Sequence, residues 1–348
     1  MSSLSPRNRL ERWIARTVLS LPAGLRRWLA GAPVSRLGRT LDTQIQLMLK
    51  LQAASGAKPW YAQPVGKARR QLDLESGFLA PEPPALASVE ALMLEGPDGV
   101  IPARIYRPQG LPAAAPALVF YHGGGFVLGS LESHDVPCRQ LAAAVPCVVI
   151  SVDYRLAPEY PFPAGPNDAL AAFRDIARRA GTLGLDPARL AVGGDSAGGN
   201  LATVVAQQTR SDAIRPCFQL LIYPTVDATT SFPSIQTFAE GFLLQKTSID
   251  WFVANYLPAT QDKKDPWCSP YYGDLAGLPP AFVQTAGFDP LCDEGEAYIE
   301  RMREAGVAVE ARRYEGLIHG YLNMSGYVHA AGRAVDDLSA ALRRAYAI

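Results

Sequence analysis

The sequence predicts an α/β fold with a mostly parallel β-sheet and helices on both of its faces. Short runs of apolar and β-branched residues alternate with helical patterns along most of the 348-residue chain. The apolar runs are uninterrupted, as is typical of parallel strands that are buried on both faces. Hydrophobic residues make up 48% of the chain, so it can bury a sizeable core, and its length suits one large domain with an added subdomain.

Residues 1–40 are strongly basic. They contain eight arginines and a single acid, Glu11, although the whole chain balances 33 Lys and Arg against 33 Asp and Glu. The arginines are Arg7, Arg9, Arg12, Arg16, Arg26, Arg27, Arg36 and Arg39. Segments rich in arginine and poor in acids are typical of membrane-surface helices and of organellar targeting segments.

We interpret this basic segment as an amphipathic helix that packs on the body of the protein. Leu10, Trp13, Ile14 and Val18 would form the packing face, and the arginines would be solvated. Contact with a membrane surface and organellar targeting are the alternatives. No apolar run approaches the roughly 18 to 20 residues that cross a bilayer, and we expect a cytoplasmic protein.

After the basic segment the pattern changes from helical to extended. Residues 41–54 have a helical pattern, and residues 80–87 (APEPPALA) form a linker. A period of two follows in residues 88–95 and 100–106, which predicts two strands. Gly-Pro-Asp-Gly at 96–99 predicts the turn of a β-hairpin between them.

The alternation of strands and helices begins after this hairpin. Strands are expected at residues 117–121, 147–152, 189–193, 217–222, 281–287 and 307–314. Helices are expected near residues 166–180, 197–210, 294–305 and 326–346. Residues 225–270 interrupt the alternation with a Thr/Ser-rich loop, a helix at 247–257 and a charged, Pro-flanked stretch. We expect this insertion to fold over the ends of the strands as a lid.

A candidate nucleophile lies in the motif Gly194-Asp195-Ser196-Ala197-Gly198, which matches G-x-S-x-G. The motif follows a predicted strand and precedes a predicted helix, which is the context that it requires. Its serine occupies a tight turn, where side chains at the glycine positions would collide with the neighbouring strand and helix. The free N–H groups at the start of the helix also point at the reaction centre. We therefore predict Ser196 as a nucleophile, and an ordinary turn is the alternative.

The sequence His122-Gly123-Gly124-Gly125 directly follows the strand expected at 117–121. Three consecutive glycines leave their N–H groups open to an anion, which predicts the second half of an oxyanion hole. A phosphate-binding loop is the alternative. It is disfavoured because the glycine spacing is G-x-G-x-x-x-G and no Gly-Lys-Ser/Thr follows.

The chain has only four histidines, so the base can be found by elimination. Hydrolases with this serine motif place serine, acid and histidine in that order along the chain, which excludes His122 and His134. His329 falls inside the helix expected at 326–346, where a histidine is more often a packing residue. His319 lies in a loop after the last strand, and we predict it as the base.

Two carboxylates between the serine and the histidine are candidates for the acid that orients the base. Asp289 follows the strand expected at 281–287 and so lies at its carboxyl end. Asp293 is four residues later and begins the next helix, where an acid also serves as a cap. We predict Asp289 as the acid and Asp293 as a residue that supports it.

Five segments in the same order resemble the hormone-sensitive-lipase-like family of esterases, in the branch that carries Gly-Asp-Ser-Ala-Gly. They are HGGGF at 122–126, DYRLAPEYPFPAG at 153–165, GGDSAGGNLA at 193–202, GFDPLCDE at 287–294 and HGY at 319–321. The resemblance extends from about residue 41 to the C-terminus and says nothing reliable about residues 1–40.

This resemblance implies an α/β-hydrolase fold with an eight-stranded sheet and a helical cap. Residues 1–80 would supply the N-terminal arm and cap helices, residues 81–348 would form the catalytic domain, and residues 225–270 would return to the cap. The resemblance also implies hydrolysis of small esters without a cofactor or metal. It assigns the oxyanion hole to the backbone N–H groups of Gly124, Gly125 and Ala197.

The sequence therefore predicts a serine carboxylesterase that acts on small-molecule esters with short to medium acyl chains. The limit on chain length rests on an apolar pocket closed by aromatic residues of the cap. These are Phe232, Phe238, Phe242, Trp251 and Phe252. An amide or N-acetyl hydrolase with the same triad is one alternative. A non-catalytic ligand-binding receptor on this fold is another, and the presence of His319 argues against it.

Nothing in the sequence indicates a metal, an organic cofactor or a nucleic-acid partner. The overall charge is balanced, and the five cysteines have neither Cys-x-x-Cys nor zinc-like spacing. We expect them to be free, mostly packed thiols. The oligomeric state is left open, and a dimer is compatible with the sequence.

Overall fold

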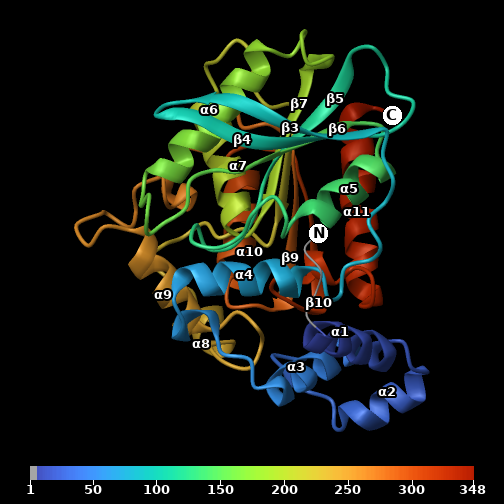
Figure 1. The fold of residues 1–348 in the computed structure, drawn as a ribbon. Helices are drawn as coiled ribbons and strands as arrows, with labels where there is room; N and C mark the ends of the chain where they lie inside the picture. The colour runs from blue at the N-terminus through green and yellow to red at the C-terminus, as the bar shows by residue number, and fades with distance from the viewer. Residues whose placement is uncertain (1–5) are drawn as a thin grey trace.

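The computed structural model describes residues 6–348, so the first five residues of the basic segment lie outside the described residues. Its centre is an eight-stranded sheet with the order β10-β9-β8-β7-β5-β6-β4-β3 (Figure 1). β4 pairs antiparallel with β3 and β6, and the other neighbours are parallel. The strands are β3 (Ser88–Gly96), β4 (Gly99–Arg107), β5 (Ala115–Tyr121), β6 (Val148–Val152), β7 (Leu185–Asp195), β8 (Gln219–Ile222), β9 (Ala281–Phe288) and β10 (Val309–Ile318). The predicted mostly parallel sheet is confirmed.

Helices cover both faces of this sheet. The covering helices are α5 (Asp135–Ala144), α6 (Ala164–Arg178), α7 (Ala197–Gln208), α10 (Cys292–Glu304) and α11 (His329–Tyr346). α6, α7 and α10 pack on one face, and α5 and α11 pack on the other (Figure 1). In β5, Val119 and Tyr121 belong to one apolar cluster, whereas Leu118 and Phe120 belong to the other. Successive strand side chains point to opposite faces, so a continuous apolar run gives two buried faces.

Most of the observed elements lie close to the expected residues, and two differences bear on the predictions for the site. Helix α5 is an addition to the predicted set. It contains Pro137 in its first turn, a position at which proline is tolerated because its missing N–H would have no helical partner. The second difference concerns His329, which is the exposed first residue of α11. The interpretation of His329 as a packing residue inside that helix is therefore wrong.

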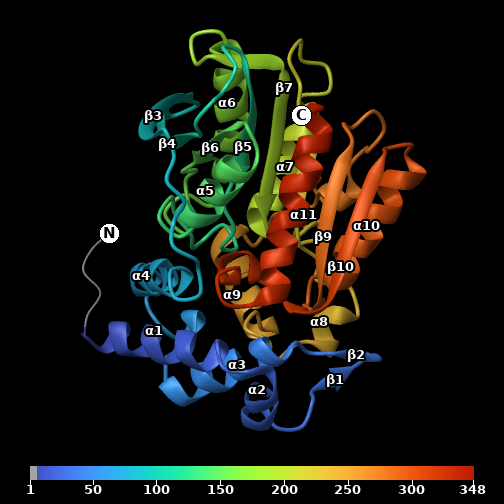
Figure 2. The ribbon, with the colours of Figure 1, turned by 90° about the vertical axis from the view of Figure 1, so that its right-hand side faces the viewer.

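A helical cap lies at one end of the sheet and is built from two separate parts of the chain (Figure 2). The first part contains α1 (Pro6–Leu19), α2 (Ala23–Ala30), β1 (Ser35–Arg36), β2 (Arg39–Thr40), α3 (Thr43–Ser55), η1 (Trp60–Ala62) and α4 (Val65–Ser76). The second part contains α8 (Ser234–Thr237) and α9 (Lys246–Tyr256). The two parts meet where the rings of Trp60 in η1 and Phe252 in α9 lie 6.5 Å apart. The short 3₁₀ helices η2 (Pro270–Tyr272) and η3 (Tyr321–Met324) follow later in the chain.

Helix α1 packs on the body only in part as predicted. Of the four residues expected to pack, Leu10, Trp13 and Ile14 are 56%, 63% and 37% exposed, whereas Val18 packs against the core. The guanidinium of Arg16 points inward and donates to the carbonyl of Phe78 at 3.2 Å and to that of Ala80 at 3.0 Å. These carbonyls lie in an irregular stretch that offers them no helix or strand partner, and polar backbone groups in such a position require one. Their need for donors turns the arginine side of α1 toward the protein.

Candidate active site

Ser196 lies at the sharp turn between the end of β7 and the start of α7. Its φ angle is +55°, a left-handed conformation that is uncommon for a residue with a side chain. A Cβ atom at Gly194 would lie 2.3 Å from the carbonyl oxygen of Tyr121, and one at Gly198 would lie 1.8 Å from the same atom. Both positions require glycine because the turn contacts the end of β5, as the motif predicts.

The imidazole of His319 connects Ser196 to Asp289. Its Nε2 lies 2.9 Å from Ser196 Oγ, and its Nδ1 lies 2.7 Å from Asp289 Oδ2. The carboxylate is fully buried, and its Oδ1 accepts the N–H of Leu291 at 2.9 Å. The three predicted residues each follow the last residue of a strand, in β7, β9 and β10. Such an arrangement of hydroxyl, imidazole and carboxylate can carry out nucleophilic catalysis with general base assistance.

Asp293 lies apart from this hydrogen-bonded series. It is in the first turn of α10, as predicted. Its Oδ2 accepts the N–H of Ser234 at 2.9 Å, and its own N–H donates to Ser234 Oγ at 3.1 Å. This reciprocal pair ties the start of α10 to α8 of the cap. Any support that Asp293 gives to Asp289 therefore acts through the backbone between them.

The glycine loop after β5 lies beside Ser196. Gly124 and Gly125 have φ angles of +123° and +62°, which favour glycine. A Cβ atom at Gly125 would lie 2.3 Å from the ring of Phe252. No hydrogen-bond acceptor in the described part of the chain takes up the N–H of Gly124 or Gly125. Ala197 is the first residue of α7, so its N–H has no acceptor within the helix.

Asp195 forms the centre of a buried polar network that the sequence patterns do not reveal. Its Oδ1 accepts the N–H of Gly123 at 2.8 Å and lies 3.0 Å from His134 Nε2. The carboxylate thereby connects the turn that carries Ser196 to the glycine loop. Burial opposes ionisation, but His134 and the Gly123 N–H outweigh it and hold the pKa of Asp195 below its ordinary value. No spacing rule connects residues 134 and 195, so the sequence offers no signal for this pair.

The two histidines that chain order excludes as the base make structural contacts instead. The ring of His122 is stacked on that of Tyr154, with centroids 4.5 Å apart, and its Nδ1 lies 2.8 Å from the Gly123 carbonyl. Burial lowers the pKa of His122 to about 4, so the ring is neutral near pH 7. His134 Nδ1 lies 2.8 Å from Ser133 Oγ, while its other ring nitrogen faces Asp195.

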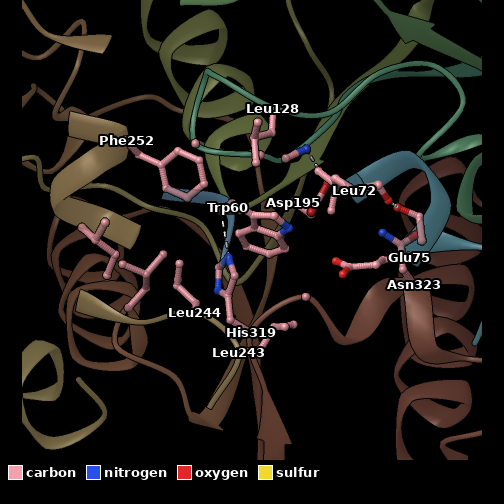
Figure 3. Close-up of a pocket in the computed structure, with 18 of the residues that line it drawn as sticks. Trp60, Leu72, Glu75, Leu128, Asp195, Leu243, Leu244, Phe252, His319 and Asn323 are labelled. Carbon is pink, nitrogen blue, oxygen red and sulfur yellow. Dashed lines mark hydrogen bonds between the residues drawn. The ribbon is translucent and has the colours of Figure 1, made fainter. Parts of the chain in front are cut away.

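A cavity of about 500 Å³ opens in front of Ser196 and His319, with side chains of both parts of the cap in its wall (Figure 3). Of the five aromatic residues expected to close it, only Phe252 lines it. Phe238, for example, is fully buried with its ring centroid 5.6 Å from that of Phe288. The other aromatic residues of the wall are Trp60, Phe78, Phe126 and Tyr256. The prediction of an aromatic wall is therefore wrong for four of its five residues, which pack elsewhere.

Glu294 is one of several carboxyl groups that line this cavity. Glu294 is fully buried, and its Oε1 accepts the N–H of Val226 at 2.8 Å and the hydroxyl of Thr225 at 3.0 Å. Its Oε2 has no hydrogen-bond partner among the described residues. Burial raises the pKa of Glu294 to about 8, so the group is mostly protonated at neutral pH.

Within residues 6–348, no three His, Cys, Asp or Glu side chains are grouped so that they could hold a metal ion. The five cysteines are free thiols, and four of them are buried, as the sequence predicts. Burial raises the pKa of Cys217 to about 11 and those of Cys147 and Cys292 to about 12, which keeps these thiols protonated at neutral pH.

Comparisons with known proteins show which family this chain resembles. A family model described as the α/β hydrolase fold matches residues 118–323. The chain is 43% identical over 322 residues to the carboxylic ester hydrolase LipN of Mycobacterium tuberculosis, covering 90% of this chain and 85% of LipN. It is 38% identical over 314 residues to an ethyl acetate hydrolase of Pseudomonas putida, covering 88% and 99% of the two chains. An ester hydrolase from the metagenome of Lake Arreo, solved with a bipyridine phosphonate derivative, has a TM-score of 0.86 and 43% identity, covering 88% and 100%.

Proposed function

The chain belongs to the hormone-sensitive-lipase-like family of α/β hydrolases and is a carboxylic ester hydrolase, and from that premise we propose that Ser196, His319 and Asp289 are its catalytic triad. The observation that carries this proposal is the continuous hydrogen-bonded series from Asp289 through His319 to Ser196. Ser196 and His319 line a cavity large enough for a small-molecule substrate.

In the first half of the reaction, Ser196 Oγ attacks the carbonyl carbon of the ester while His319 Nε2 accepts the hydroxyl proton. Asp289 accepts a hydrogen bond from Nδ1–H, which keeps Nε2 unprotonated before the attack and stabilises the imidazolium after it. His319 then gives the proton to the leaving alcohol as the bond between acyl carbon and alcohol oxygen breaks. In the second half, water attacks the acyl-enzyme with the same base and releases the acid.

The negative charge of each tetrahedral intermediate develops on the former carbonyl oxygen. We assign its stabilisation to the backbone N–H groups of Gly124, Gly125 and Ala197, and this is supported by the absence, within residues 6–348, of another acceptor for the two loop donors. Removal of one such donor typically costs about 10²–10³ in turnover. The Asp195 carboxylate fixes the loop relative to the nucleophile through Gly123.

We propose that the preferred acyl chains are short to medium, with an optimum of roughly four to eight carbons. The cavity wall is mostly apolar and is bounded by Trp60 and Phe252 from the two parts of the cap (Figure 3). Its volume of about 500 Å³ is that of a pocket for a compact ligand. The Pseudomonas putida relative is named for a small ester, ethyl acetate, which is consistent with this range.

The test is a series of p-nitrophenyl esters from acetate to palmitate, measured with the wild type and with Ser196→Ala. We expect an optimum within the stated range and no measurable turnover by the variant. A serine-directed phosphonate should add once to the wild type, as seen by mass spectrometry, and not to the variant. A folded wild type that is inert to the phosphonate would refute the triad and favour a ligand-binding receptor. Faster cleavage of matched anilides would favour an amide hydrolase, and an optimum at palmitate would favour a lipase.

A further inference from the structure

The outer end of the cap carries an apolar face that no described residue covers. We call it the N-terminal apolar face, and it consists of Leu10, Trp13, Ile14, Leu25, Trp28, Leu29 and Leu37. Eleven large apolar side chains are exposed in residues 6–348, and these seven are the majority of them. Trp28 is the most exposed of all, at 76%. Such a concentration of exposed large apolar side chains in two consecutive helices and the turn at Leu37 is typical of an interaction surface.

The two helices of this face repeat one pattern. Apolar residues occupy positions i, i+3 and i+4 in each, which places them on one side of a helix. They are Leu10, Trp13 and Ile14 in α1, and Leu25, Trp28 and Leu29 in α2. Both helices lie at the end of the molecule farthest from the β3–β4 hairpin (Figures 1 and 2).

Specific contacts on the opposite sides of α1 and α2 hold the apolar residues outward. Arg16 donates to two carbonyls of the main body, as described above, and Leu19 at the end of α1 is completely buried. In α2, Arg26 donates to the Leu19 carbonyl at 3.0 Å, and Ala30 is buried. A rotation of either helix that hid its tryptophan would break these contacts. The exposure is therefore fixed by the fold.

The charge around this face is positive. Glu11 is the only acid in residues 1–40, which contain eight arginines. Some of these arginines are neutralised by the body, since Arg12 and Arg16 pair with Glu82 and Arg39 pairs with Glu315. Arg27 and Arg36 are exposed, and no carboxylate of the described chain pairs with either. Tryptophan and leucine on one side, with arginine around them, is the composition of helices that lie in a membrane interface.

We propose that the N-terminal apolar face docks on the surface of an anionic lipid membrane. None of the described helices is long and apolar enough to cross a membrane, so α1 and α2 would lie in the interface with their tryptophans at the headgroup level. A second copy of the chain is a poorer occupant, because a two-fold interface would bring two basic, acid-poor faces together. Anionic headgroups complement the same charge.

Docking at this face would also bring the active-site cavity close to the lipid. Glu11, Ile14 and Ala15 of α1 line the cavity that contains Ser196 and His319. Ile14 belongs to both surfaces, so the docking face continues into the cavity wall. The binding step itself requires no hydrolysis and can be measured whether or not the proposed triad is correct.

The test is flotation of the full-length protein with vesicles of phosphatidylglycerol and phosphatidylcholine in equal parts, at low and high salt. Trp13→Ala/Trp28→Ala should weaken binding at least about tenfold, because two interfacial anchors are lost. Arg27→Gln/Arg36→Gln should weaken binding roughly fivefold per charge removed and reduce its salt dependence.

A matched control replaces two exposed apolar residues of the β3–β4 hairpin, Met93 and Val100, with alanine. This variant should float like the wild type. None of the six substituted residues lines the cavity, so turnover of soluble p-nitrophenyl acetate should be unchanged in all three variants. Unchanged turnover also shows that each variant is correctly folded.

Failure of the wild type to float with anionic vesicles at low salt would overturn the proposal, as would equal flotation of the tryptophan variant. Sedimentation of the wild type as a dimer that Trp13→Ala/Trp28→Ala dissociates, without vesicle binding, would assign the face to a second copy of the chain and also overturn it.

Discussion

Replacement of Asp289 by asparagine tests the least obvious assignment in the active site, because two aspartates lie within one turn of each other. In the wild type, the Asp289 carboxylate receives Nδ1–H of His319 at 2.7 Å, so the imidazole keeps Nε2 free to accept the Ser196 proton at 2.9 Å. An asparagine amide can instead present N–H to Nδ1, which stabilises the tautomer with the proton on Nε2. That tautomer cannot act as a base toward Ser196.

The size of the expected effect follows from this change of tautomer. Asp289→Asn keeps the shape of the buried side chain but removes its charge, so we expect turnover to fall by about 10⁴. This corresponds to about 5.5 kcal/mol in the activation barrier. Asp293→Asn is the matched control, because its amide oxygen can still accept the N–H of Ser234. We expect that variant to lose tenfold or less, through a small shift of the cap.

The assay is the turnover number of both variants on p-nitrophenyl butyrate, with folding checked by circular dichroism. The pH profile of the residual activity adds a second readout, since a merely misfolded fraction would keep the wild-type profile. Equal losses in the two variants would mean that both carboxylates act on His319. A larger loss for Asp293→Asn would refute the assignment of Asp289.

Three further predictions concern Glu294 in the cavity wall, the glycine loop and the effect of metal removal. Burial raises the pKa of Glu294 in the folded protein to about 8, from an ordinary value of 4.5. The contribution of this group to stability is therefore full below about pH 4.5 and is lost as the pH rises through about 8. Between about pH 6 and pH 9, the free energy of unfolding should therefore fall by roughly 3 kcal/mol more in the wild type than in Glu294→Gln, as measured by urea unfolding. Equal falls in the two proteins would contradict this. Gly125→Ala should lower turnover about 10²–10³-fold because its Cβ meets the Phe252 ring at 2.3 Å. The control Gly110→Ala should leave turnover unchanged, because Gly110 is also left-handed but no atom lies within 4 Å of the position of its Cβ. EDTA should leave esterase activity unchanged, whereas loss of activity that zinc restores would require a metal.

The sequence was sufficient to bring together the main residues of the site because their positions depend on strand order. His122, Ser196, Asp289 and His319 each come directly after a strand, in β5, β7, β9 and β10. The carboxyl ends of parallel strands meet at one edge of a sheet, so residues there converge whatever their separation along the chain. Locating the strands therefore predicted which side chains would lie close together, without any knowledge of loop conformation.

Features that depend on side-chain contacts between distant segments were not predictable in this way. The Asp195–His134 pair joins the last residue of β7 to the residue before α5, a helix that the patterns did not predict. The orientation of α1 was predicted only in part, because amphipathicity alone favours an inward apolar side, whereas carbonyls at residues 78 and 80 attract Arg16. Both cases involve a polar group whose partner is distant in the sequence, and local periodicity carries no information about it.

The buried Asp195 network explains how the active site can hold the strained backbone of Ser196 beside the glycine loop. Ser196, Gly124 and Gly125 all have positive φ angles. Only the serine has a side chain that makes this backbone conformation costly, by about 1 to 3 kcal/mol. Such strain persists only where neighbouring contacts fix the backbone, and the Asp195 carboxylate bonds to the glycine loop from the residue next to the nucleophile. A loop that moved away from Ser196 would deprive this buried charge of the N–H of Gly123, and a hydrogen bond to a charged group contributes about 1.5–3 kcal/mol, which is comparable to the strain. The carboxylate thus couples the two halves of the proposed oxyanion hole, so that donors and nucleophile are already in place before an ester binds.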